Sequence, residues 1–413
     1  MSIIKPFRAW RPRPDIAHLV ACRPYDVMNR SEAKAEANGN PYSFLHVIRA
    51  EIDLSDKTND YDEAVYRKAL YNFNRAVKNG ELWQEQSECL YIYAQTWNGH
   101  RQTGIMALLS TDDYLNDTIK KHEHTRPAKE LDRIKHMIHT HLHSEPILTA
   151  YPQVPDIDAI VAQITEQNAP DCDFTAADGI QHTLWTIKNE KDITRLCQLF
   201  AEKVPAIYIA DGHHRAASSA KVSISEKENN PHHQGNEEYN YILAVVFPDN
   251  QLKIIDYNRV VKDLNGHTEA EFLAAIAQKF DLTAQSNTYQ PQQPRHFGIY
   301  IGGIWYKAVA KDQLYTDHPI NGLDVAVLSD QVLAPILGIS DQRTDPRIDF
   351  VGGMRGMREL EKRVDSGEMA VAIAIYPVSM AQLLRVADSG EVMPPKSTWF
   401  EPKLRSGIAI HQF

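Results

Sequence analysis

Residues 206–220 read AIYIADGHHRAASSA, an apolar run that ends in an acid, a glycine, two histidines and an arginine before small residues follow. The apolar run predicts a buried strand, and the glycine predicts a tight turn into a helix. The first amides of a helix lack partners within the helix, and its dipole favours an anion there. The stretch therefore predicts a strand, turn and helix that bring four polar side chains to a ligand.

The chemistry of this turn depends on a few groups. Gly212 lets a ligand approach the backbone, and Arg215 offers paired donors to phosphate. His213 or His214 suits proton transfer near neutral pH, or a phosphate contact. The alternative is a structural role, in which Asp211 caps the helix, one histidine packs and the arginine pairs with a carboxylate.

The bulk composition is that of a globular protein of 413 residues, with 43% hydrophobic and 24% charged residues. This length exceeds what one core usually fills. We expect an α/β core over residues 1–265 and a second α/β subdomain over 266–413, whose C-terminal tail packs back on the core. The expected fold class is α/β (α+β), with mixed sheets and packed helices.

Hydrophobic periodicity sets the expected elements. Residues 61–80 have the spacing of an amphipathic helix, and residues 89–97 and 105–109 predict a hairpin around an Asn-Gly turn. The short apolar segment 44–48 predicts a strand, and the polar segment 223–240 predicts an exposed loop.

The net charge is −10, which disfavours nucleic acid as a partner. No apolar run approaches the roughly 20 residues of a membrane span, so we expect no membrane partner and a cytoplasmic location. The four cysteines contain no Cys-x-x-Cys pair that would indicate a zinc or redox motif. A small-molecule substrate is the expected partner, and a homo-oligomer is left open.

Two histidine-rich segments invite a metal hypothesis. His122-Glu123-His124-Thr125-Arg126 lacks the His-Glu-x-x-His spacing of a zinc protease. The tract of His136, His139, His141 and His143 winds round several faces of the expected helix, so exposed polar residues are the better interpretation. The identity of any metal is left unknown.

The C-terminal phrase Pro394-Pro395-Lys396-Ser397-Thr398 is similar to a phosphate-binding Lys-Ser/Thr pair but lacks the glycine-rich loop of a Walker motif. Lys396 is then a point charge for phosphate, and Ser397 and Thr398 are hydroxyl donors. The alternative is that the aromatic residues that follow anchor the tail while the lysine stays solvated.

Separated phrases resemble the domain of unknown function 1015 family. They lie in order along the chain and are PYDV (24–27), NPYSFLHVIR (40–49), HEHTRP (122–127), LW (184–185), ADGHHR (210–215) and MPPKSTWFEPKLRSG (393–407). Locally, ADGHHR also resembles the turn of ParB and sulfiredoxin-like proteins, including free-serine kinases. This second resemblance implies a ParB/sulfiredoxin-like core with a nucleotide site.

The resemblances imply roles for the residues in these phrases. As catalytic candidates they imply Asp211, His213, His214 and Glu123, with Glu123 as a base or cation ligand. For binding of the nucleotide they imply Gly212, Arg215, His122, Thr125, Arg126, Lys396, Ser397 and Thr398.

We therefore expect a nucleotide- or phosphate-binding enzyme. The favoured activity is that of a kinase or other phosphotransferase that uses ATP or ADP with Mg²⁺ and acts on a small hydroxyl-bearing metabolite such as a free amino acid. The alternatives are a nucleotide-binding regulator without catalysis and a metal-dependent hydrolase. The shared site requires Glu123 and Asp211 to lie close together.

Overall fold

The computed structural model describes residues 2–413, which divide into two compact units. The first unit holds the residues up to Leu252 together with Pro402–Phe413, and the second holds Lys253–Glu401. The sequence predicts this division at residue 265. The structure places it earlier because β14 (Tyr257–Val261) pairs with two strands of the second unit.

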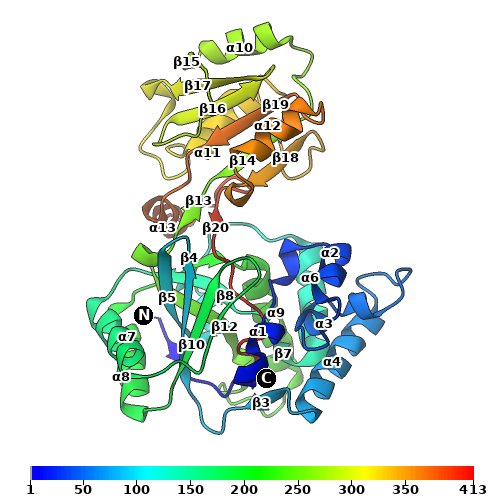
Figure 1. The fold of residues 1–413 in the computed structure, drawn as a ribbon. Coiled ribbons are helices and arrows are strands. Elements are labelled where there is room, and N and C mark those ends of the chain that lie inside the picture. Colours follow the sequence, from blue (N-terminus) through cyan, green and yellow to red (C-terminus); the bar gives the residue numbers. More distant parts are fainter. Residues whose placement is uncertain (1) are drawn as a thin grey trace. The chain divides into compact units, whose positions relative to one another are not determined.

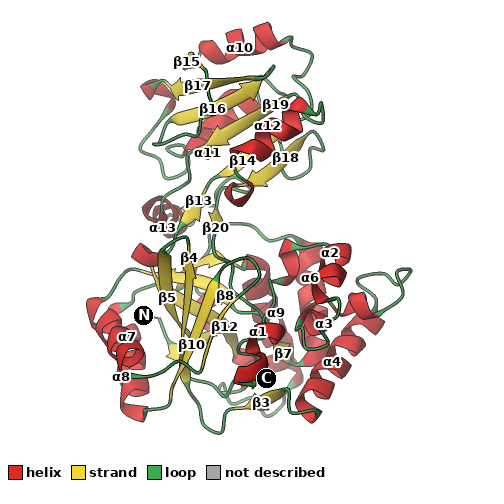
Figure 2. Ribbon diagram, viewed as in Figure 1, coloured by secondary structure: helices red, strands yellow, loops and turns green. Residues whose placement is uncertain are grey.

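A nine-stranded mixed sheet forms the centre of the first unit (Figures 1 and 2). The pairs β6 (Ile119–Lys120) with β11 (Ile207–Asp211) and β8 (Ile147–Tyr151) with β12 (Tyr241–Pro248) are parallel, whereas the other pairs are antiparallel. In order across the sheet the strands are β6, β11, β8, β12, β5 (His100–Ser110), β4 (Leu90–Trp97), β10 (Gln181–Ile187) and β9 (Cys172–Thr175), with β1 (Ile4–Lys5) paired to β5.

Helices pack on both faces of this sheet (Figure 1). Apolar side chains of α7 (Pro155–Gln167) and α8 (Glu190–Lys203) share one buried cluster with the strands. Away from them, α6 (Pro127–Thr140) packs against both α4 (Glu63–Lys78) and α9 (His213–Asn229). The remaining helices of the unit are α1 (Ala17–Val20), α2 (Arg30–Ala37), α3 (Leu45–Ile48) and α5 (Thr111–Leu115).

A small two-stranded pair ties the C-terminal residues into the first unit. The pair that does so is β7 (Leu142–His143) with β21 (His411–Gln412), whereas a second pair, β2 (Trp10–Pro12) with β3 (Leu82–Gln84), joins the N-terminal segment to the residues after α4. Single bridges also join Trp10 to Ile410 and Cys22 to Ser406.

The second unit is built on a six-stranded antiparallel sheet with its own buried cluster. Its strand order is β15 (Phe280–Gln285), β17 (Ile304–Ala310), β16 (His296–Ile301), β19 (Val371–Ile375), β14 and β18 (Ile348–Gly352). The unit also holds the pair β13 (Ile254–Ile255) with β20 (Trp399–Phe400), and the helices α10 (Glu269–Ala277), α11 (Asp324–Leu328), α12 (Met357–Asp365) and α13 (Met380–Asp388). The expected α/β class with mixed sheets and packed helices is confirmed.

Two expected elements differ from the structure. Residues 45–48 form a helical turn instead of a strand, since their apolar side chains enter a buried cluster that a short apolar run can reach in either conformation. The polar loop expected from residue 223 begins only after Asn229, because α9 continues through a serine-rich segment whose first part is buried. The hairpin at residues 89–109 is confirmed.

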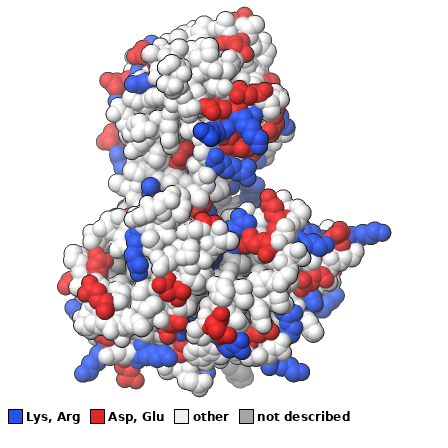
Figure 3. Space-filling view, viewed as in Figure 1, with Lys and Arg blue, Asp and Glu red and all other residues white. Residues whose placement is uncertain are grey.

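The charged side chains show no single-sign region on the face drawn in Figure 3, where acidic and basic groups are interspersed. Within residues 2–413, no helix combines the length and the apolar character needed to cross a bilayer.

A test of the core follows from Gly104 in β5. A Cβ atom at this position would lie 2.9 Å from side-chain carbons of both Val245 and Phe247. We expect Gly104→Ala to lower the free energy of unfolding by about 1–3 kcal/mol, because packed side chains must shift to admit it. Urea denaturation measures this, and an unchanged midpoint would show that the two neighbours move without cost.

Candidate functional site

The ADGHHR segment forms the predicted strand, turn and helix. β11 ends at Asp211, Gly212 has a left-handed φ of 99°, and α9 begins at His213. A Cβ atom at Gly212 would lie 2.9 Å from Ile147 and 3.0 Å from the guanidinium of Arg215. The turn therefore requires glycine for both its conformation and its close packing.

Asp211 is held between two cations. Its carboxylate lies 2.9 Å from Arg215 Nη2 and 3.0 Å from Lys403 Nζ. Burial alone would raise the pKa of Asp211, but Lys403 and Arg215 hold it well below its usual range. A carboxylate so strongly stabilised in its ionised form is a weak proton acceptor, so its evident role is to fix the turn.

Arg215 is directed inward. Its side chain is 6% exposed, and besides Asp211 its guanidinium donates a hydrogen bond to the carbonyl of Pro146, just before β8. Burial lowers the pKa of Arg215, but Asp211 and more distant carboxylates raise it above its usual value. The arginine thus joins the turn to the neighbouring strand.

The HEHTR segment lies against this turn. The rings of His122 and His213 meet edge to face with centroids 4.5 Å apart, and the His122 amide donates to His213 Nε2 at 3.5 Å. The Arg126 amide donates to His214 Nε2 at 2.9 Å. The structure thus brings the two predicted segments together, and Glu123 sits between these contacts in the sequence.

These contacts fix the state of the histidines. His213 and His214 each accept a hydrogen bond at Nε2, so each neutral ring carries its proton on Nδ1. Burial lowers the pKa of His122 to about 4 and that of His213 well below its usual value. His122 and His213 are therefore neutral at pH 7.

The other predicted residues have different surroundings. Thr125 Oγ1 donates to Glu130, and the guanidinium of Arg126 is exposed. Lys396, Ser397 and Thr398 belong to the second unit. Ser397 there donates to the carbonyl of Pro394 at 2.5 Å.

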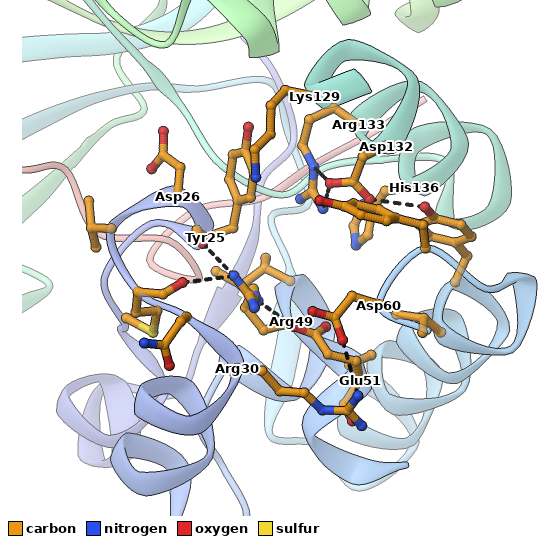
Figure 4. Close-up of a pocket in the computed structure, with 18 of the residues that line it drawn as sticks. Tyr25, Asp26, Arg30, Arg49, Glu51, Asp60, Lys129, Asp132, Arg133 and His136 are labelled. Carbon is orange, nitrogen blue, oxygen red and sulfur yellow. Dashed lines mark hydrogen bonds and ion pairs between the residues drawn. The ribbon is translucent and has the colours of Figure 1, made fainter. Parts of the chain in front are cut away.

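An open pocket of about 450 Å³, which the sequence motifs alone do not predict, lies in the first unit. Figure 4 shows α6 on one side of it and the turns around α2 and α3 on the other. The polar residues labelled there are Tyr25, Asp26, Arg30, Arg49, Glu51, Asp60, Lys129, Asp132, Arg133 and His136.

Most charges of this pocket cancel in pairs. The pairs are Arg30–Asp60 at 3.0 Å, Arg49–Glu51 at 2.5 Å and Arg133–Asp132 at 2.7 Å. Lys129 and Asp26 differ, because within residues 2–413 no hydrogen bond or ion pair engages either side chain. The pocket thus presents one uncommitted cation and one uncommitted anion.

A buried network connects the pocket to the turn. Glu145 accepts a hydrogen bond from the Tyr25 amide at 2.9 Å and lies 3.4 Å from Arg133, which stacks 3.9 Å from the Tyr25 ring. The next residue, Pro146, accepts the hydrogen bond from Arg215. The pocket and the turn are therefore linked through residues 145 and 146.

Some signals for the pocket were in the sequence. The PYDV phrase supplies Tyr25 and Asp26, and Arg49 ends the NPYSFLHVIR phrase. Lys129, Asp132 and Arg133 have the spacing of one helix face. Only the fold, however, shows that these segments meet.

The histidine tract is partly buried, contrary to the expectation of exposed polar residues. His136 Nε2 lies 3.1 Å from the carbonyl of Val47, and His143 stacks on His411. Burial lowers the pKa of His136 to about 4. Across residues 2–413, no group of three or more His, Cys, Asp or Glu side chains is placed to hold a metal ion.

A family model described as "Protein of unknown function (DUF1015)" matches residues 4–326, and the chain belongs to this family. No curated protein matches the chain.

Several solved structures are similar to the chain. Free serine kinase in complex with AMP has 12% identity, with 74% of this chain and 91% of that chain covered at a TM-score of 0.37. SbnI with a C-terminal truncation from Staphylococcus aureus has 13% identity, 73% and 85% coverage and a TM-score of 0.39. A conserved hypothetical protein from Pyrococcus furiosus has 13% identity, 74% and 94% coverage and a TM-score of 0.36.

The ion pairs of Asp211 generate a stability prediction. We expect Asp211→Asn to lower the free energy of unfolding by about 2 kcal/mol at pH 7, because the buried Arg215 loses its carboxylate. Chemical denaturation measures the difference. Asp56→Asn, which breaks the exposed Asp56–Lys34 pair, is the matched control and leaves stability nearly unchanged. Equal effects of both substitutions would contradict the anchoring role of Asp211.

The buried histidines generate a pH prediction. The pKa of His136 is about 4 in the folded chain and about 6.5 in the unfolded chain, so the unfolded state binds this proton first as pH falls. The contribution of His136 to the free energy of unfolding is therefore fully present above pH 6.5. It decreases by about 1.4 kcal/mol per pH unit as the pH falls from 6.5 to 4. Urea denaturation between pH 7 and 4.5 should show a shallower pH dependence for His136→Gln than for the wild type. Substitution of the exposed His18 should leave the slope unchanged.

Proposed function

We propose that the protein is a phosphotransferase that moves a phosphoryl group from a nucleotide to the hydroxyl of a small zwitterionic metabolite, such as a free amino acid. One observation carries the proposal. Among the charged side chains of the pocket, only Lys129 and Asp26 lack a hydrogen bond or ion pair within residues 2–413, and the pocket is linked to the ADGHHR turn through Glu145 and Arg215.

The uncommitted pair suits a zwitterion. Lys129 offers its ammonium to a ligand carboxylate, and Asp26 accepts hydrogen bonds from a ligand ammonium or hydroxyl. A volume of about 450 Å³ is within the usual range for small-molecule sites. Burial lowers the pKa of Arg215, whereas Asp211 and, after it, Asp26 raise this pKa. The negative charge of Asp26 therefore acts on the arginine of the turn.

The turn suits the phosphates. The first amides of α9 and its dipole favour an anion. The backbone amide of Arg126 donates to His214 in the first turn of α9. Its side chain is exposed, and within residues 2–413 no hydrogen bond or ion pair engages its guanidinium. The resemblance of residues 210–215 to the turn of free-serine kinases supports a nucleotide as the donor.

The reaction forms a bond between the acceptor oxygen and the terminal phosphorus and breaks the bond to the bridging oxygen of the nucleotide. The hydroxyl proton passes to a carboxylate, and Asp26 and Glu123 are the candidates, since Asp211 is neutralised by two cations. Mg²⁺ would neutralise the phosphates. It commonly binds through phosphates, waters and one or two carboxylates, so Glu123 with a single further oxygen would suffice on the protein side.

The test combines binding and turnover. We expect ATP or ADP with Mg²⁺ to raise the melting temperature, and a panel of hydroxyl-bearing amino acids to yield a phosphomonoester by ³¹P NMR. Lys129→Met should raise the KM for the acceptor about tenfold or more and leave nucleotide binding intact. Lys135→Met on the same helix, outside the pocket lining, is the control. Nucleotide binding without turnover would make the protein a regulator, and absence of binding would reject the proposal.

A further inference from the structure

Arg259 in β14 of the second unit has no exposed surface and is the largest fully buried side chain of the described residues. Four other arginines of the chain are buried, and each forms an ion pair with a carboxylate. Those pairs are Arg11–Glu85, Arg133–Asp132, Arg215–Asp211 and Arg405–Asp178. Arg259 has no such partner within residues 2–413, so its charge is buried without a counter-ion.

Neutral groups surround this guanidinium. It donates to the carbonyls of Tyr257 and, at 3.3 Å, Pro395, and it lies 5.1 Å from the centre of the Phe350 ring. Its Nε is buried and has no hydrogen-bond partner. Burial lowers the pKa of Arg259 to about 10. The group therefore remains charged at neutral pH but incompletely satisfied.

A second cation lies beside it. Lys396 directly follows Pro395, which accepts the hydrogen bond from Arg259, and its Nζ lies 5.7 Å from the centre of the Tyr257 ring. Its φ of 58° is in the left-handed region that residues with a Cβ rarely adopt. Across residues 2–413, no carboxylate pairs with Lys396. Within residues 2–413, two cations without counter-ions thus contact Tyr257, Arg259 at its carbonyl and Lys396 over its ring.

The segment that carries Lys396 is folded onto β14 and β18, which are adjacent strands in Figure 1. Ser397 donates to the carbonyl of Pro394 and closes a tight turn, and Trp399 packs edge to face on Tyr257 at 4.8 Å. A Cβ atom on Gly352 would meet the Trp399 ring at 3.1 Å. The turn at residues 394–398 therefore covers Arg259 as a small, well-packed segment.

We propose that Arg259 and Lys396 form a binding site for an oxyanion, the phosphate or carboxylate group of a small molecule, beneath the turn at residues 394–398. The bound anion is the counter-ion of Arg259, for which the described chain provides no carboxylate. The planar guanidinium gives paired donors, and the lysine adds a point charge. Entry requires the turn to lift from β14, and the bound anion then holds it closed.

This site is independent of the proposed function. Its residues all belong to the second unit, whereas the pocket and the ADGHHR turn belong to the first. Each can fail without the other, because the anion test uses no nucleotide.

The test uses the full chain in a buffer free of phosphate. We expect millimolar inorganic phosphate to raise the melting temperature by about 2–4 °C and to slow amide hydrogen exchange in peptides covering residues 257–261 and 393–401. Arg259→Met should abolish both effects. Without phosphate this variant should be at least as stable as the wild type, because it removes an uncompensated buried charge. Acetate and sulfate in parallel distinguish carboxylate from tetrahedral oxyanions.

A second variant, Lys396→Met, tests the proposal even if Arg259→Met does not fold. We expect Lys396→Met to weaken phosphate binding about tenfold without loss of stability. The control is Lys362→Met, whose side chain is 77% exposed in the same unit, and it should behave as the wild type. Absence of exchange protection at residues 393–401 in the wild type, or equal protection in Lys396→Met, would overturn the proposal.

Discussion

The ion pairs of Asp211 with Arg215 and Lys403 are the contacts on which the rest of the site depends. They join the end of β11 to the first turn of α9 and to residues from the far end of the chain. The C-terminal segment 402–413 is thereby fixed beside the turn, where Ser406 also contacts Glu145. Because Lys403 and Arg215 both stabilise the ionised form of this carboxylate, Asp211 holds these segments together and is a weak proton acceptor.

The charged side chains of the pocket fall into two groups, those that form ion pairs within the protein and those that do not. Buried pairs such as Arg49–Glu51 hold the turns around α2 and α3 in place, since a cation and an anion at 2.5 Å satisfy each other. Lys129 and Asp26 have no such partners within residues 2–413 and lie where a ligand can reach them. Most charges of the pocket thus help to shape the cavity, and these two are the ones to which the proposed function assigns ligand binding.

Local signals in the sequence were sufficient for local structure. The apolar run, the glycine and the small residues of 206–220 determine a strand, a turn and a helix because each acts over a few residues. The site could be predicted only in part. Lys403 instead of Lys396 reaches Asp211, and the pocket combines residues from the segments 25–32, 48–66 and 129–136. Nothing in the spacing of these segments encodes that they meet, because packing of α6 and α4 decides it.

Charge burial follows two different rules in the two units. In the first unit every buried arginine faces a carboxylate, which repays much of its desolvation within the chain. In the second unit Arg259 is more deeply buried than any of them, and its guanidinium contacts two carbonyls and an aromatic ring but, within residues 2–413, no carboxylate. A structural arginine at this position could be replaced by an apolar side chain at little cost. Its charge is therefore best explained by an anion that the chain itself does not supply.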